Sequence, residues 1–225
     1  MKALFFGSIG SVVETSELQR QSFNRAFADH VLNWVWDRAM YAEMLKTSGG
    51  ALRIATYAAA RGQSVDAGAI HRTKTQLFLE GLAHDGIPPR PGVVDLLKYA
   101  QGAGLMTGFI STTEQATVDL ILGKLTKSGV APLDLVTSRA IGLDPKPSPA
   151  AYRYALKTLS LDPSQAIVIE DNLDGVQAAH GAGVRVIAYP GDFDDPADFK
   201  LADGIVTDAL RQTVIAILAA SKASA

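Results

Sequence analysis

Cysteine is absent from this chain of 225 residues. Its absence excludes disulfide bonds, thiolate metal ligands and cysteine nucleophiles, and it fits a reducing compartment, so we expect a cytoplasmic protein. Long apolar runs are also missing, because no window approaches the roughly 20 apolar residues that span a bilayer. Nor is there a basic run, since 21 lysines and arginines stand against 23 aspartates and glutamates. The composition therefore predicts neither a membrane-spanning protein nor a nucleic-acid binder, and it favours a small-molecule partner.

Short apolar runs that are rich in β-branched or aromatic residues, with Gly, Asp or Pro at their ends, predict buried strands. These runs cover residues 3–6, 105–110, 133–137, 166–169 and 184–189. Helical patterns separate the later strands and cover residues 93–103, 114–127, 149–159 and 173–182. Strands that alternate with helices predict the α/β class, with a Rossmann-like, doubly wound parallel sheet.

One long interval interrupts this alternation. Residues 16–89 show helical patterning alone, as in Leu18, Phe23 and Phe27. A proline-rich stretch at 88–91 marks the return to the sheet. We therefore predict a core domain of residues 1–15 and 90–225, with a small α-helical domain of residues 16–89 inserted into it.

Two glycine pairs look like fragments of a dinucleotide-binding loop, Gly102 with Gly104 and Gly181 with Gly183. Each pair ends a predicted helix and leads into a strand, whereas a pyrophosphate-binding loop leaves a strand and opens a helix. We therefore interpret these glycines as helix terminators.

Polar residues follow several of the predicted strands. In an open parallel sheet, ligands bind at the carboxyl ends of the strands. Glu170 and Asp171 follow the strand at 166–169 and suit a hard cation such as Mg2+. The alternative is that Asp171 or Asn172 caps the helix that begins near Leu173.

Two further strand ends carry groups that suit an oxyanion. Lys146 lies between two prolines, so its backbone is stiff and its ammonium can be aimed at a phosphate. The alternative is a solvent-exposed lysine in a proline-rich loop. Ser111 and Thr112 follow the strand at 105–110 and precede a helix start, where hydroxyl and N–H groups bind oxyanions. The alternative there is that Thr112 or Thr113 is a helix cap.

The order and spacing of these elements resemble the haloacid dehalogenase superfamily, in the branch of β-phosphoglucomutase, phosphoglycolate phosphatase and CbbY-type sugar-bisphosphate phosphatases. The resemblance runs nearly end to end. Ser111 stands at the family's second-motif hydroxyl, Lys146 at its lysine, and Glu170 with Asp171 at its acidic motif. The resemblance implies that residues 16–89 form a cap domain that closes over the substrate. Within this segment, residues 49–53, ending in Arg53, resemble the Gly-Gly-Lys-x-Arg loop of CbbY-type proteins, although Ala51 stands where that loop has its lysine.

The first motif departs from the family. After the first strand the family has an aspartate, any residue, a second aspartate and then Gly-Thr, whereas this chain has Gly7-Ser8-Ile9-Gly10-Ser11. In the family the first aspartate attacks phosphorus and helps to hold Mg2+, and the second protonates the leaving group and activates water. Gly7 and Ile9 have no atoms for these tasks. We therefore expect weak Mg2+ binding at most, at Glu170 and Asp171.

The main hypothesis is a non-catalytic family member that binds a phosphorylated metabolite, inorganic phosphate or a partner protein. Its predicted phosphate contacts are Gly10, Ser11, Ser111, Thr112 and Lys146, with Arg53 from the cap. One alternative is an active hydrolase in which Glu170 and Asp171 hold a metal that activates water. Ser8 or Ser11 is a weaker candidate nucleophile, because no base is assigned near them. A third hypothesis is a protein-interaction module with a vestigial pocket.

Overall fold

The computed structural model describes residues 1–46, 49–84, 86–208 and 210–223. These residues form two compact units. Unit 1 comprises Met1–Glu14, Pro88–Gly191 and Asp195–Ala225, and unit 2 comprises Thr15–Ile87 and Asp192–Asp194. The chain therefore leaves unit 1 after Glu14, returns to it at Pro88, and passes through unit 2 again after Gly191.

Unit 1 is built on one parallel sheet with the strand order β3-β2-β1-β4-β5-β6. Its strands are β1 (Ala3–Phe6), β2 (Met106–Ile110), β3 (Leu135–Thr137), β4 (Ala166–Glu170), β5 (Arg185–Ala188) and β6 (Gly204–Ile205). The predicted Rossmann-like parallel sheet is confirmed, and each predicted strand coincides with an observed one to within two residues. The edge strand β6 was not predicted, because two residues leave no periodic signal.

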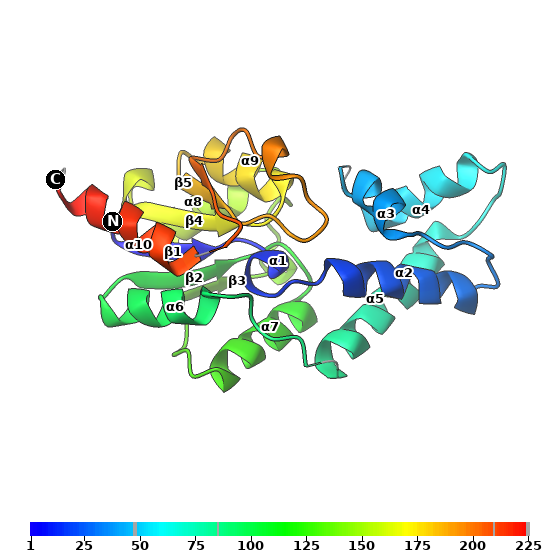
Figure 1. The fold of residues 1–225 in the computed structure, drawn as a ribbon, viewed down its shortest axis with the longest axis horizontal. Coiled ribbons are helices and arrows are strands. Elements are labelled where there is room, and N and C mark those ends of the chain that lie inside the picture. Colours follow the sequence, from blue (N-terminus) through cyan, green and yellow to red (C-terminus); the bar gives the residue numbers. More distant parts are fainter. Residues whose placement is uncertain (47–48, 85, 209, 224–225) are drawn as a thin grey trace. The chain divides into compact units, whose positions relative to one another are not determined.

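Helices cover both faces of this sheet, with α8 and α9 on one side and α6 and α7 on the other (Figure 1). The helices of unit 1 are α1 (Ile9–Val12), α6 (Val93–Gly102), α7 (Gln115–Lys127), α8 (Ala150–Thr158), α9 (Leu173–Gly181) and α10 (Leu210–Ala223), with short 3-10 turns η1 (Arg139–Ile141), η2 (Pro163–Gln165) and η3 (Pro196–Asp198). Both sheet faces are covered, which explains why β1 and β4 are buried along their whole length and are apolar except for Glu170 at the end of β4.

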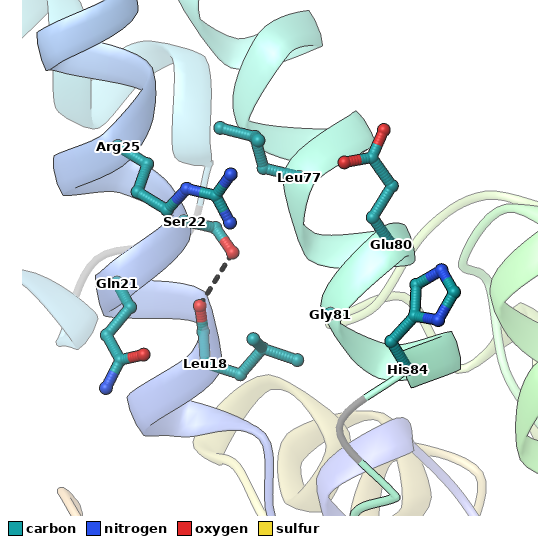
Figure 2. Close-up of a pocket in the computed structure, with 8 residues that line it drawn as sticks. All are labelled: Leu18, Gln21, Ser22, Arg25, Leu77, Glu80, Gly81 and His84. Atoms are coloured by element: carbon teal, nitrogen blue, oxygen red, sulfur yellow. Dashed lines mark hydrogen bonds between the residues drawn. The ribbon is translucent and has the colours of Figure 1, made fainter.

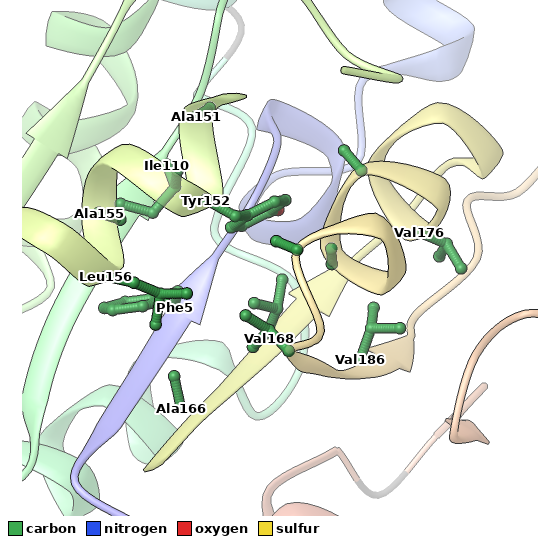
Figure 3. Packing of buried hydrophobic residues seen from close by; sticks show 14 of the residues in the cluster. Phe5, Ile110, Ala151, Tyr152, Ala155, Leu156, Ala166, Val168, Val176 and Val186 are labelled. Carbon is green, nitrogen blue, oxygen red and sulfur yellow. The ribbon is translucent and has the colours of Figure 1, made fainter. Parts of the chain in front are cut away.

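The face under α8 and α9 holds the main hydrophobic cluster of unit 1. Phe5 of β1, Val168 of β4 and Val186 of β5 pack there against Tyr152 and Val176 from the two helices (Figure 3). Alternate residues of each strand point to this face, as the pleat of a strand requires. The same packing holds Tyr152, which is fully buried, next to the carboxyl end of β1.

Glycine ends the two helices that lead back into the sheet. Gly104 has a φ of 73° after α6, and Gly183 has a φ of 74° after α9. Positive φ is the conformation that glycine adopts at low cost beyond a helix end. The interpretation of these glycines as helix terminators is confirmed. Among the helices of the described residues, none is both long and apolar enough to cross a membrane.

Unit 2 is helical. It contains α2 (Ser16–Asp29), α3 (Arg38–Leu45), α4 (Gly50–Ala59) and α5 (Ala67–His84), with α2 and α5 lying side by side (Figure 1). Aromatic rings form much of its interior, and the Phe27 and Trp36 rings meet edge to face with centroids 4.6 Å apart. Such ring pairs add about 0.5–1.5 kcal/mol beyond the area that they bury. Unit 2 therefore has a hydrophobic core of its own.

Val31, in the loop between α2 and α3, is strained. Its φ is 57° and its side chain is 90% exposed, so a β-branched residue holds a left-handed conformation without burial to offset the cost. We predict that Val31→Gly stabilises unit 2 by about 1 kcal/mol, because glycine removes the Cβ clash of that conformation. Urea unfolding followed by tryptophan fluorescence measures this, since Trp34 and Trp36 both lie in unit 2.

Val35 provides the matched control. It lies in the same loop and is 69% exposed, but its φ is not positive. Val35→Gly should therefore lower stability by about 0.5–1 kcal/mol, through the extra freedom of the unfolded glycine chain. Equal losses in the two variants would show that the conformation of Val31 stores no strain.

Candidate functional site

The predicted strand-end residues of unit 1 converge at one edge of the sheet. In register, Phe6 of β1 lies between Phe109 of β2 and Ile169 of β4. Gly7 and Ser111, which follow β1 and β2, and Glu170, the last residue of β4, therefore lie along the carboxyl edge of three neighbouring strands.

Glu170 is the centre of this edge. It has no exposed surface, and its carboxylate forms an ion pair with Lys146, with the Lys146 Nζ 2.6 Å from Oε1. The Tyr152 hydroxyl donates to the same oxygen, and the Ser8 hydroxyl lies 2.5 Å from Oε2. Lys146 also donates to the Gly7 carbonyl and to the Tyr152 oxygen. Both charges of the pair are thus satisfied by protein groups, as burial requires.

The Glu170 network fills the space in which a side chain at position 7 would begin. A β-carbon on Gly7 would overlap the Tyr152 hydroxyl and the Glu170 carboxylate. A β-carbon on Gly175 would overlap the same carboxylate, and one on Gly10 would overlap Asp171. Glycine at positions 7, 10 and 175 therefore leaves room for the carboxylates of Glu170 and Asp171.

Tyr152 was not recognised from the sequence. Burial, and then the negative charge of Glu170, raise the pKa of its hydroxyl well above the usual value, so it stays protonated and donates to the carboxylate. A buried tyrosine hydroxyl needs a polar partner, which is the signal that could have identified it. Lys146 and Tyr152 are six residues apart, and the turn at the start of α8 brings them together.

The Ser8 hydroxyl lies between two carboxylates, because it contacts Asp171 as well as Glu170. A hydroxyl has one proton, so it donates to one of these acids at a time. The expectation that no base lies near Ser8 is therefore wrong: two carboxylates contact it. Sequence separation hid this contact, since more than 160 residues lie between Ser8 and either acid.

The predicted helix cap after β4 is confirmed, whereas the predicted helix cap after β2 is wrong. Asn172 is the N-cap of α9 and accepts the Gly175 N–H at 2.9 Å, so its predicted capping role is confirmed. The N-cap of α7 is Glu114, so the predicted capping by Thr112 or Thr113 is wrong. The Thr113 N–H instead binds the Ser111 hydroxyl oxygen at 3.2 Å.

The two serines proposed as phosphate contacts differ in what they can donate. The Ser11 hydroxyl donates to the Ser8 carbonyl at 2.6 Å and is fully buried. Ser111 only accepts, from Thr113, and among the described residues nothing accepts its proton. Ser111 therefore has a hydroxyl proton to offer an oxyanion, whereas that of Ser11 is already used.

Arg53 lies on α4 in unit 2. Its Nε donates to the Met44 carbonyl at 2.9 Å, and its guanidinium lies 5.7 Å from the centre of the Tyr41 ring. Lys74 of α5 is a second buried cation in this unit and was missed in the sequence. It lies against the Phe23 and Phe78 rings, and burial, with a smaller effect of Arg53, lowers its pKa to about 7.

A separate cavity of about 210 Å³ opens between α2 and α5 of unit 2 (Figure 2). Its walls are formed by Leu18, Gln21, Ser22, Arg25, Leu77, Glu80, Gly81 and His84. None of the predicted site residues lines this cavity.

The acidic pair fits Mg2+ poorly. Mg2+ is usually held by one or two carboxylates and several waters in octahedral geometry, and these carboxylates must be free to coordinate it. Glu170 already has the Lys146 ammonium as its counter-ion. Across the part of the chain that the structure describes, no three acidic or histidine side chains gather as a metal site would require. The arrangement therefore suits the Lys146 ammonium as the counter-ion of Glu170 better than it suits a divalent ion.

The buried ion pair leads to a stability prediction. Lys146→Met would leave the Glu170 carboxylate buried without a cation, which we expect to destabilise unit 1 by about 3–5 kcal/mol. The control is Lys157→Met on the exposed side of α8, where we expect a change within about 0.5 kcal/mol. Urea unfolding followed by far-UV circular dichroism reports both. Equal, small effects would mean that the pair contributes little to folding.

Comparison with known proteins places this geometry in a family. The model for haloacid dehalogenase-like hydrolases matches residues 10–189, so the match begins just beyond Gly7 and Ile9. Protein CbbY of Cereibacter sphaeroides is 35% identical over 212 residues, which cover 92% of this chain and 91% of that relative.

Two crystal structures of CbbY from Rhodobacter sphaeroides resemble the fold. The complex with phosphate has a TM-score of 0.76 at 35% identity, and a variant in complex with xylulose-(1,5)bisphosphate has a TM-score of 0.77 at 34% identity. In each case the match covers 92% of this chain and 93% of the other. The sequence and the fold therefore agree along nearly the whole chain, which belongs to the haloacid dehalogenase-like hydrolase family.

Proposed function

We propose that this chain binds a phosphorylated small molecule and does not carry out aspartyl-phosphate catalysis. One observation carries the proposal: position 7 has no carboxylate, and Tyr152 and Glu170 occupy the space where its side chain would begin. The side chains around Gly7 therefore pack in a way that leaves room for glycine at this position and not for aspartate.

The chemistry of the first strand end supports this proposal. Covalent phosphoryl transfer needs a nucleophile and a group that moves the proton of the leaving group. Gly7 and Ile9 supply neither. Removing one member of such a catalytic unit usually removes most of the rate, so the loss of both leaves positioning and electrostatics alone. A water activated by a metal at Glu170 and Asp171 is disfavoured, because Lys146 neutralises Glu170.

The relatives indicate which ligand class to test first. CbbY from Rhodobacter sphaeroides binds phosphate, and its variant binds xylulose-(1,5)bisphosphate. In this chain we assign the phosphate contacts to the Ser111 hydroxyl, the Gly10 and Thr112 backbone and the charge of Lys146. We propose that unit 2 is a cap domain and that Arg53 supplies its positive charge to the ligand.

A second candidate function rests on the position of Ser8. Its hydroxyl contacts the carboxylates of Glu170 and Asp171, either of which could accept its proton during attack on an ester. Against this route, two carboxylates repel a phosphate, and the Lys146 charge that would offset them is shared with Glu170. Hydrolysis of an aryl phosphate that is lost in Ser8→Ala would establish this alternative.

Calorimetric titration with inorganic phosphate and with a panel of sugar phosphates tests the binding proposal. We expect Ser111→Ala to weaken binding about ten- to a hundredfold, because a hydrogen bond to a charged ligand is lost. Ser128→Ala is the control, since that hydroxyl donates to the Lys124 carbonyl in α7 and lies at the other end of the helix. The proposal fails if none of these ligands releases or absorbs heat with the unmodified chain.

Restoring the missing carboxylates gives a further prediction. The double variant Gly7→Asp, Ile9→Asp should stay inactive towards an aryl phosphate with added Mg2+, and should lose about 1–3 kcal/mol of stability from overpacking against Tyr152 and Glu170. Adding Tyr152→Phe removes one overlapping atom and should recover part of that stability. Full activity in the double variant would show that the pocket has kept its catalytic shape.

A further inference from the structure

Arg90 is a buried arginine that takes no part in the Glu170 network. It is 9% exposed and follows the return of the chain to unit 1 at Pro88. One terminal nitrogen, Nη1, donates to the Gly10 carbonyl at 2.9 Å and to the Tyr189 carbonyl at 2.7 Å. The other, Nη2, donates to the Pro190 carbonyl at 2.6 Å.

The surroundings of Arg90 hold the guanidinium in one orientation. Its central carbon lies 3.4 Å from the centre of the Tyr189 ring, and the Tyr189 hydroxyl donates to the Pro91 carbonyl at 3.2 Å. Within the described part of the chain, the acceptors of this side chain are all backbone carbonyls, so carbonyl dipoles and the ring face balance its charge. A lysine could not reproduce this arrangement, because it has neither the planar fork nor the stacking face.

The segments that Arg90 joins all lie next to points where the chain passes between unit 1 and unit 2. Gly10 and Val12 lie just before the exit after Glu14, and the Arg90 N–H itself donates to the Val12 carbonyl at 2.8 Å. Tyr189 and Pro190 lie just before the exit after Gly191. One side chain thus ties together the unit 1 ends of three connections to unit 2.

Gly10 connects the hydrogen bonds of Arg90 to the candidate site. It belongs to the loop of residues 7–11, in which Ser8 contacts Glu170 and Asp171. Gly10 also lies so close to Asp171 that no β-carbon fits between them. A bond that fixes the Gly10 carbonyl therefore fixes the peptide plane that carries the Ser11 N–H, and with it the path of the loop.

We propose that Arg90 is a positioning residue for the phosphate loop. It holds residues 7–11 in their binding conformation and couples them to the connections of unit 2, without touching the ligand. The expected effect on phosphate affinity rests on the proposed function. The expected effect on the conformation of residues 7–11 does not, because it is measured in the protein without ligand.

The experiment compares Arg90→Gln and Arg90→Lys with the unmodified chain. Amide hydrogen exchange by NMR in the free protein should accelerate at least about tenfold at Ser11 and Val13 in both variants, since bonds to a charged donor are lost or reduced. Arg90→Lys should recover part of the protection. Amides of the central strands, such as Val168, should change much less, which separates a local effect from general destabilisation.

A matched control and a ligand measurement complete the design. Arg153→Gln removes an exposed arginine that also donates to a backbone carbonyl, that of Gly181, and should leave the loop unchanged. Phosphate affinity should fall about tenfold in Arg90→Gln and remain normal in Arg153→Gln. If the unmodified chain binds no phosphate, the proposed function fails, and the exchange data still decide the role of Arg90.

Tyr189→Leu keeps the result interpretable if Arg90→Gln does not fold. It removes the ring beneath the guanidinium while retaining the carbonyl acceptor, and should accelerate exchange at Ser11 and Val13 to a smaller extent. Unchanged exchange at Ser11 and Val13 in folded Arg90→Lys and Tyr189→Leu overturns the inference. So does acceleration that is equal in the loop and at Val168, because it would show that Arg90 only stabilises the fold.

Discussion

The candidate site depends on one buried ion pair, between Lys146 and Glu170. A carboxylate with no exposed surface is costly to ionise unless a cation and hydrogen bonds satisfy it. Lys146 supplies the charge, and Tyr152 and Ser8 supply the remaining contacts. The positions of the first loop, of α8 and of the β4 end are therefore tied to each other through this pair.

That constraint links the missing nucleophile to the shape of the pocket. An aspartate at position 7 would compete for the space that Tyr152 and Glu170 occupy, so its absence and their positions form one consistent arrangement. A ligand phosphate must then share the Lys146 charge with Glu170. Under the binding proposal, the phosphate therefore relies on Ser111, whose proton has no acceptor among the described residues, and on the charge that we propose Arg53 supplies from unit 2.

The family relationship and the departure from it concern different parts of the chain. Similarity to CbbY extends over 92% of the sequence, and Ser111, Lys146, Glu170 and Asp171 stand where the family resemblance leads one to expect a hydroxyl, a lysine and two acids. The departures lie at the end of β1, where Gly7 and Ile9 stand, and at Ala51 in unit 2. Strand β1 lies at the centre of the sheet and is fully buried, so the fold tolerates the loss of the carboxylates that follow it.

The sequence by itself determined the strand and helix order, the helical insertion and the absence of the usual nucleophile. Periodicity is a local property, and a missing carboxylate can be read directly from Gly7. Only the tertiary structure decided that Glu170 is paired with a lysine, that Ser8 contacts two acids, that Tyr152 donates to Glu170, and that Arg90 donates to the Gly10 carbonyl. These contacts join residues far apart in the chain or on separate elements, and each depends on burial and on the direction of a side chain, which no local pattern records.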